Sequence, residues 1–220
     1  EESQLPQLIE EIAAIEGVEW LRALYCYPER VDERLLDTMK RLPNVCDYLD
    51  LPMQHISQHI LTDMNRTDTS THIRKVCRMF KERGMMLRTT LMVGFPGETD
   101  FVAETKFDRM GAFMFCPEDG TRAADMPNQV PEEVKQERYD RLMTLQHGIS
   151  LAQNKARVGT TCRVLVEKKR GSRYVGRSEF EAPETDGNIF FNSEEPCEIG
   201  TFVNVKITGA KAYDLMGERV

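Results

Sequence analysis

The residues with the clearest capacity for chemistry follow an apolar stretch of strand length, Leu87 to Val93. The next five residues, Gly94 to Glu98, read GFPGE. An apolar strand that ends in glycines and an acidic residue is how parallel α/β proteins present backbone groups to a ligand. A tight turn, which needs glycine for its backbone angles, is the simpler explanation. No Gly-Lys-Ser/Thr follows, so the segment is not a phosphate-binding loop of that kind.

A second candidate is the pair Gln54 and His55, which ends another predicted buried strand, YLDLPM. A single histidine after a strand is more often a hydrogen-bonded structural residue than a ligand, because its ring can satisfy two partners. Gln54 is therefore the stronger candidate for a contact with a cofactor or substrate.

Polar residues also interrupt the apolar strand itself, at Arg88, Thr89 and Thr90. Buried polar groups must find partners, so at least one of these side chains is expected to have a specific contact. We expect one of Arg88 and Thr90 to face a cofactor, although alternation along the strand does not say which.

One basic cluster lies in the last third of the chain. It consists of Lys168, Lys169, Arg170, Arg173 and Arg177. A solvated hairpin is the simpler explanation of such a run. The functional alternative is a patch that contacts RNA or a protein surface, although few aromatic residues interleave with it to stack on single-stranded RNA.

The cysteines give no metal-binding pattern. No two of them form a CxxC or CxxxCxxC motif, which iron–sulfur and zinc sites commonly use. We expect most of them to be small buried hydrophobic residues and name no metal ligand. The six are Cys26, Cys46, Cys77, Cys116, Cys162 and Cys197.

Composition limits the class of protein. The 220 residues are 40% hydrophobic, which is enough for ordinary cores in one large or two small domains. No apolar run is long enough to span a membrane, and the first residues do not resemble a signal peptide, so we expect a soluble protein of the reducing cytoplasm. The net charge of -7 argues against broad nonspecific attraction to nucleic acid.

The periodicity of the apolar residues predicts two kinds of domain. Strands alternating with helices indicate βα units and a parallel sheet, whereas short strands separated by turns indicate a small antiparallel β-barrel of the OB-like kind. We place the βα part in residues 1–130, a linker helix in 131–157 and the β-barrel in 158–220. Within the first part, helices are predicted over 6–15, 32–42, 57–65 and 69–83, and strands over 20–27, 48–53, 87–93 and 109–115.

One connection is shorter than a parallel sheet needs. Only residues 100–106 remain between the GFPGET segment and the next predicted strand. Helical residues rise about 1.5 Å each, so this segment covers about 10 Å, whereas a strand of ordinary length measures about 17 to 20 Å. Either residues are missing from this segment or the local fold is altered.

Several motifs together resemble the radical-SAM methylthiotransferase family. In the first part these are YCYP, DLPMQHIS, MNR, LRTTLMVGFPGET and FDRMGAFMFCPEDGT. The later motifs VPEEVKQERYDRLM, YVGRSEFEAPETDG and VKITGAKAYDLMGE are similar to the linker helix and TRAM domain of that family. The resemblance extends over nearly the whole chain and implies a partial TIM-like radical-SAM barrel followed by the TRAM barrel.

The resemblance also implies cofactors and site residues. Family members bind S-adenosylmethionine and two 4Fe-4S clusters, one of which generates a 5'-deoxyadenosyl radical while the other handles the sulfur. The implied cofactor contacts in this chain are Gln54, one of Arg88 and Thr90, and the segment Gly94, Phe95 and Pro96 beside the adenine. The cysteines that hold both clusters are absent from this chain. We therefore expect it to resemble the carboxyl portion of such an enzyme, to contain no catalytic residue that can be named and to be inactive alone.

YCYP, the Gln54-His55 pair and APETDG favour the RimO-type branch, which inserts a methylthio group at the β-carbon of an aspartate in ribosomal protein uS12. The implied partners are that protein or the small ribosomal subunit, with RNA contact through the TRAM-like barrel, and no membrane. The basic cluster would be the substrate-binding patch. The alternatives are a tRNA methylthiotransferase of the MiaB type and a noncatalytic TRAM module that binds RNA or a ribosomal protein.

Overall fold

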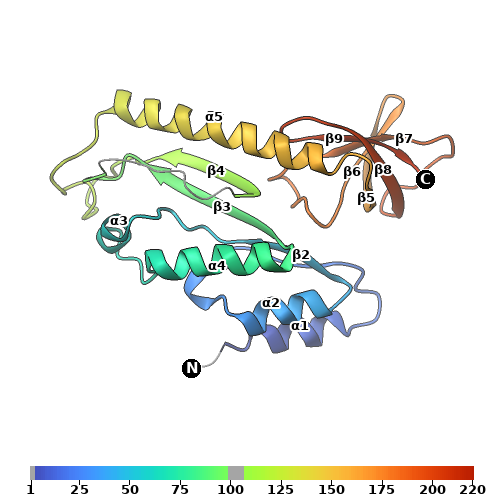
Figure 1. Ribbon diagram of the computed structural model, residues 1–220, viewed down its shortest axis with the longest axis horizontal. Helices are drawn as coiled ribbons and strands as arrows, with labels where there is room; N and C mark the ends of the chain where they lie inside the picture. The colour runs from blue at the N-terminus through green and yellow to red at the C-terminus, as the bar shows by residue number, and fades with distance from the viewer. Residues whose placement is uncertain (1–2, 99–106) are drawn as a thin grey trace. The chain divides into compact units, whose positions relative to one another are not determined.

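The computed structural model describes residues 3–98 and 107–220. It divides into two compact units, Glu1–Gln146 and His147–Val220 (Figure 1). The boundary falls within one long helix, α5 (Glu132–Ala156), in the region where the sequence predicts a helix over 131–157. Among the described residues, no helix combines the length and apolar character that a membrane crossing demands.

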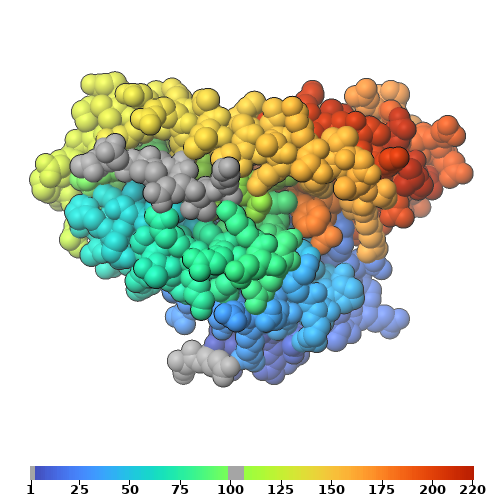
Figure 2. Space-filling view, in the orientation of Figure 1, coloured from blue at the N-terminus to red at the C-terminus, as the bar shows by residue number. Residues whose placement is uncertain are grey.

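The first unit is built on a parallel four-stranded sheet in the order β1-β2-β3-β4. Helices α1, α2 and α4 lie on one side of this sheet in Figure 1, and in Figure 2 the side chains of α3 and α4 lie on the face in view. The strands are β1 (Leu21–Ala23), β2 (Val45–Asp50), β3 (Met86–Val93) and β4 (Arg109–Met114). The helices are α1 (Leu5–Ala13), α2 (Glu33–Arg41), α3 (Gln58–Asp63) and α4 (Ser70–Arg83), with a short 3₁₀ turn, η1 (Pro28–Arg30).

Capping residues explain where the two central helices begin. Asp32 precedes α2, and its carboxylate accepts a hydrogen bond of 2.8 Å from the Leu35 backbone N–H. Thr69 precedes α4, and its hydroxyl accepts one of 3.1 Å from the His72 N–H. Each cap satisfies a backbone donor that the first helical turn leaves without a partner. Gly84 then ends α4 with a φ of 63°, the left-handed conformation that glycine adopts most easily.

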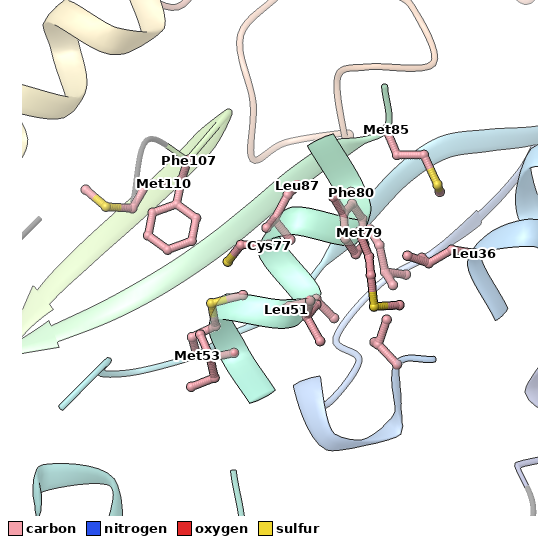
Figure 3. Packing of buried hydrophobic residues seen from close by; sticks show 14 of the residues in the cluster. Leu36, Leu51, Met53, Cys77, Met79, Phe80, Met85, Leu87, Phe107 and Met110 are labelled. Atoms are coloured by element: carbon pink, nitrogen blue, oxygen red, sulfur yellow. The ribbon is translucent and has the colours of Figure 1, made fainter. Parts of the chain in front are cut away.

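Strand β3 alternates strictly between buried and half-buried residues. Leu87, Leu91 and Val93 belong to the core that the sheet shares with helices α2 and α4. Figure 3 shows Leu87 among side chains of α4, including Cys77 and Phe80. The residues between them, Arg88 and Thr90 among them, therefore lie on the opposite face of the sheet, because side chains alternate along a strand.

The short connection predicted between β3 and β4 involves residues 100–106, which lie outside the described residues. The strands on either side of it are nevertheless in register, with Thr90 paired to Gly111 and Val93 to Met114. The parallel arrangement that the alternation of helices and strands predicts is therefore confirmed for β1 to β4.

The second unit contains a closed five-stranded barrel in the order β5-β6-β7-β9-β8. Its core consists of alternate residues of these strands, such as Val164, Val166, Ile189 and Phe191. The sequence predicts an antiparallel barrel, and four of the five strand pairs are antiparallel, but β7 and β9 pair in parallel. The apolar alternation within a strand does not specify the direction of its neighbour. The strands are β5 (Thr161–Arg170), β6 (Arg173–Arg177), β7 (Ile189–Asn192), β8 (Phe202–Ala210) and β9 (Leu215–Arg219).

Candidate functional site

Three successive strands of the first unit leave the sheet through residues with positive φ. Tyr25 follows β1 with a φ of 57°, Gln54 follows β2 with 66°, and Gly94 follows β3 with 78°. The carboxyl ends of neighbouring parallel strands meet at one edge of the sheet, which is where α/β proteins place their ligand sites. Two of the three residues are not glycine and adopt a conformation that is costly for side chains with a Cβ. This edge is therefore the candidate site.

Gln54 is tied to the middle of this edge. Its N–H donates to the Thr90 carbonyl at 3.0 Å, and its carbonyl accepts from the Met92 N–H at 2.7 Å, so it extends the pairing of β2 with β3. Its side-chain Oε1 is buried and has no hydrogen-bond partner within residues 3–98 and 107–220. A buried acceptor without a donor costs about 1–3 kcal/mol. A ligand that donates a hydrogen bond would remove this cost.

His55 is buried and hydrogen-bonded within the fold, as expected of a structural residue. The side chain is 2% exposed, and its Nδ1 accepts a hydrogen bond of 3.0 Å from the Ser57 backbone N–H. Nδ1 can accept only when the ring proton is on Nε2, so this contact selects the neutral tautomer. Burial lowers the pKa of His55 to about 4. The histidine thus shapes the turn that follows Gln54.

We expect acid to destabilise the first unit through His55. The pKa of this ring is lower in the folded chain than in the unfolded chain. Its contribution to the unfolding free energy is therefore complete above pH 6.5 and is lost as the pH falls to about 4. This difference corresponds to about 3 kcal/mol. Urea denaturation between pH 7 and pH 4, followed by the fluorescence of Trp20, the only tryptophan in the sequence, measures the loss.

The variant His55→Gln is the control, because its amide does not titrate and retains an oxygen for the Ser57 N–H. Its unfolding free energy should fall less steeply over the same pH range. An equal acid slope in the variant and the wild type would assign the pH dependence to other groups.

Arg88 and Thr90 occupy the same face of the sheet. If Gly111 on the neighbouring strand had a Cβ, that atom would lie 3.6 Å from Arg88 Nη2 and 4.0 Å from Thr90 Oγ1. Arg88 Nε is 3.6 Å from Asp50 Oδ1 on β2, an ion pair with little solvent exposure. The Arg88 and Thr90 side chains therefore both lie on the site side of the sheet, because residues two apart in a strand point the same way, and the expectation that one of them contacts a cofactor stays a prediction.

Thr89, the remaining polar residue of the strand, points to the opposite face, where its side chain has hydrogen-bond partners. Its hydroxyl donates to the Leu51 carbonyl at 2.7 Å and lies 3.3 Å from the Met53 N–H as an acceptor. The side chain is completely buried. Thr89 therefore links β3 by hydrogen bonds to the segment that leads into Gln54. These bonds give a buried polar group the partners that it requires.

Polar groups of the GFPGE loop find their partners within this chain. The buried Glu98 carboxylate accepts a hydrogen bond from the Gly94 N–H and forms an ion pair of 3.2 Å with Arg138 of α5. Burial raises the pKa of Glu98, while the bonds to Gly94 and Arg138 oppose that rise. Pro96 is buried, and the ring of Phe95 contacts that of Phe115 edge-on at 5.2 Å between centroids. The loop is thus a fixed wall of the candidate site.

Lys135 of α5 presses against the same loop. Its side chain is 2% exposed, and its Nζ donates to the Phe115 carbonyl at 2.9 Å. A Cβ on Gly94 would be 2.2 Å from Lys135 Cγ. Glycine is therefore required at position 94 both for its φ and for the approach of this lysine.

The described residues do not fit an iron–sulfur cluster. No group of three or more His, Cys, Asp or Glu side chains in residues 3–98 and 107–220 is arranged to hold a metal ion. All six cysteines are free thiols. Burial raises the pKa of Cys26 and Cys162, and raises that of Cys77 to about 11. Such thiols are far from the thiolate form that binds iron.

The five residues of the basic cluster do not form one uniform patch. The hairpin of β5 and β6 places Lys168, Lys169, Arg170 and Arg173 at its exposed tip, around a turn at Gly171. Arg177 is half-buried farther along β6, and its Nε donates to Glu167 at 2.7 Å.

Sequence reasoning missed a buried polar network in the second unit. Glu181 is 1% exposed, accepts from the Ser178 N–H at 3.0 Å and forms an ion pair with Arg157. Arg157 also donates to the Ser178 hydroxyl at 3.1 Å. A glutamate with an arginine and a serine in a turn has no distinctive spacing in the sequence, so only the structure identifies the network.

Two family models match the chain. The Radical SAM superfamily model covers residues 2–106, and the TRAM domain model covers residues 158–220. Among solved structures, the radical S-adenosylmethionine methyltransferase TsrM from Kitasatospora setae is similar over 50% of this chain and 24% of that chain, with 21% identity and a TM-score of 0.39. That likeness is too slight to bear on the fold.

Curated relatives match much more closely. Two proteins named ribosomal protein uS12 methylthiotransferase RimO are 46% identical in Desulforamulus reducens and 47% identical in Desulfitobacterium hafniense. The matches cover 99% and 100% of this chain but 52% of each relative, so the chain spans about half the length of the curated relatives it matches. Both alignments extend over 230 positions and so include positions that this chain lacks. On these grounds the chain matches the Radical SAM superfamily in its first part and the TRAM domain in its last part, and over nearly its whole length it is similar to proteins named RimO.

Proposed function

We propose that this chain provides part of the S-adenosylmethionine cleft and the substrate-recognition domain of a RimO-type methylthiotransferase. The reaction of the whole enzyme would place a methylthio group on the β-carbon of an aspartate in ribosomal protein uS12. The observation that carries the proposal is the buried Oε1 of Gln54 at the carboxyl edge of the sheet, which has no hydrogen-bond partner among the residues that the structure describes. The similarity to relatives named RimO supports it.

The residues present fit S-adenosylmethionine but not the clusters. Gln54 Oε1 would accept a hydrogen bond from an amine or hydroxyl of the cofactor, and the rigid segment Gly94, Phe95 and Pro96 would flank its adenine. When bound, the cofactor supplies the radical that removes hydrogen from carbon. Arg88 and Thr90 would line the same side of the sheet as polar groups. The task of these residues is to bind, orient and exclude water.

In the second unit, the hairpin tip would contact the ribosomal substrate. Its four cationic side chains are exposed and can approach RNA or an acidic protein surface. Arg177 is less suited because Glu167 holds it. We assign residues 1–130 to the radical-SAM part, 131–157 to the linker and 158–220 to the TRAM barrel, in an enzyme that acts in the cytoplasm on its ribosomal partner.

A chimera tests this function. The amino-terminal half of the Desulforamulus reducens relative, joined to this chain and reconstituted anaerobically with iron and sulfide, should methylthiolate uS12, as peptide mass spectrometry detects. The chain alone should give no product. A chimera that cleaves S-adenosylmethionine but leaves uS12 unmodified would contradict the substrate, and a methylthiolated tRNA would favour the MiaB type.

The same assay tests the hairpin tip. Replacing Lys168, Lys169 and Arg170 with glutamate should raise the KM for uS12 presented within the small ribosomal subunit about tenfold or more, since the glutamates would repel the RNA phosphates that the three cations attract. Arg177→Gln is the matched control and should leave KM nearly unchanged. Equal effects from both changes would contradict a role for the tip.

A further inference from the structure

Two tyrosines beside the candidate site are exposed to an unusual degree. Tyr25 is 77% exposed, the highest value among the large hydrophobic side chains of the described residues, and Tyr27 is 59% exposed. Both lie directly after β1, at the sheet edge that also carries Gln54. Exposed aromatic rings in such a position provide apolar contact area and a hydroxyl for hydrogen bonding, the combination that is enriched at interfaces.

The backbone of Tyr25 is strained. Its φ of 57° belongs to the left-handed region, which disfavours a residue with a bulky side chain. A glycine would relieve this strain and preserve the turn. Strain of this kind clusters at functional sites, where the surrounding structure maintains it. The ring of Tyr25 is thus held at this edge at a cost to stability.

Contacts with neighbouring elements hold the segment from Tyr25 to Pro28 in place. The Cys26 N–H donates to the Asp50 carbonyl at 2.9 Å, and the Pro28 carbonyl is 2.9 Å from His72 Nε2. The guanidinium of Arg66 lies 5.4 Å from the centre of the Tyr27 ring. Because the rings are already positioned, a partner that binds them loses less conformational entropy in ordering this surface.

The charges nearby favour a polypeptide over a nucleic acid. Beside Tyr27, the exposed Glu29 carboxylate accepts from the Thr67 hydroxyl at 3.0 Å, and Arg66 is paired with the buried Asp68 at 2.8 Å. The two carboxylates and the two guanidinium groups, counting that of Arg30, have formal charges that cancel. They leave no excess positive charge to attract a phosphate backbone. A protein that binds ribosomal RNA carries Lys and Arg, which stack well on tyrosine rings and pair with a carboxylate such as Glu29.

From these observations we propose that Tyr25 and Tyr27 contact the substrate protein and hold the segment that carries its target aspartate at the carboxyl edge of the sheet, beside Gln54. This inference rests on the proposed function, since it takes uS12 as the substrate. It adds the residues of the first unit that bind that segment. Lys or Arg residues of the segment would pack on the two rings, and the aspartate would reach toward the face that carries Arg88.

Binding of purified, fluorescently labelled uS12 to the 220-residue chain tests the inference by anisotropy. Tyr25→Gly and Tyr27→Ala should each weaken binding about tenfold, whereas Tyr25→Phe should change it less than twofold. Tyr25→Gly should also raise the urea midpoint of unfolding, because glycine relieves the positive φ. A loss of affinity together with a gain in stability separates a contact residue from a structural one.

Tyr213→Ala removes an exposed tyrosine of the second unit and is the matched control, with no expected change in affinity. If the wild type binds uS12 and the Tyr25 and Tyr27 variants bind it equally well, the inference is overturned while the proposed function stands. If the wild type does not bind uS12 at all, the result contradicts both the inference and the proposed function. Binding of a ribosomal RNA fragment that depends on Tyr25, without such dependence for uS12, would overturn the inference in favour of base stacking.

Discussion

Replacing Gly94 with alanine should lower the unfolding free energy of the first unit by about 3 kcal/mol or more. The new Cβ would lie 2.2 Å from Lys135 Cγ and 2.7 Å from Lys135 Cδ. Lys135 cannot move away cheaply, because its Nζ is bonded to the Phe115 carbonyl and to Glu132. The φ of 78° adds backbone strain. Urea denaturation followed by Trp20 fluorescence reports on this unit alone.

Gly84→Ala is the matched control. Gly84 also has a positive φ, of 63°, but a Cβ there would meet nothing within 4 Å. Only the conformational cost remains, about 1 kcal/mol. If Gly94→Ala costs no more than Gly84→Ala, the approach of Lys135 does not constrain the loop. Shortening the lysine in the double variant Gly94→Ala, Lys135→Ala should recover part of the steric cost.

The second large effect is expected from Glu181→Ala in the barrel unit. This change leaves Arg157 without its partner at Glu181 and the buried Ser178 N–H without its acceptor. Removing one partner of a buried ion pair typically costs about 3–5 kcal/mol. Hydrogen exchange of peptides from β5 to β9 should show a corresponding loss of protection, because Trp20 does not report on this unit.

Glu167→Ala provides the comparison within the same barrel. Glu167 pairs with Arg177 at 2.7 Å, but its side chain is 31% exposed. Exposed pairs contribute about 1 kcal/mol or less. Similar protection in the two variants would show that the buried network contributes no more than a surface pair.

The sequence was sufficient for the parallel sheet because strong apolar strands alternate with amphipathic helices. Strand β3 was predicted over 87–93 and begins one residue earlier, at Met86. The predicted strand over 20–27 was too long, since β1 ends at Ala23. A positive φ at Tyr25 and the proline at position 28 end the extended conformation, and hydrophobic periodicity carries no information about either effect.

The site was predictable only in part. Its place at the strand ends follows from the parallel sheet, and Gln54 and the GFPGE loop both lie there. The contacts that fix the loop join Glu98 to Arg138 and Gly94 to Lys135, pairs about forty residues apart in the chain. Such long-range pairs leave no local pattern. The same holds for the buried oxygen of Gln54, since its lack of a partner among the described residues is a property of the packed structure.

The position of β9 within the barrel affects how this unit can fold. Strand β9 lies between β7 and β8 and pairs with both, although it follows both of them in the sequence. Until residues 215–219 have left the ribosome, β7 and β8 have no neighbour on that side, and their open edges can pair with other chains. Closure also requires contacts between distant parts of the barrel sequence, which slows folding. The barrel therefore closes only once its sequence from β5 to β9 is available as a whole.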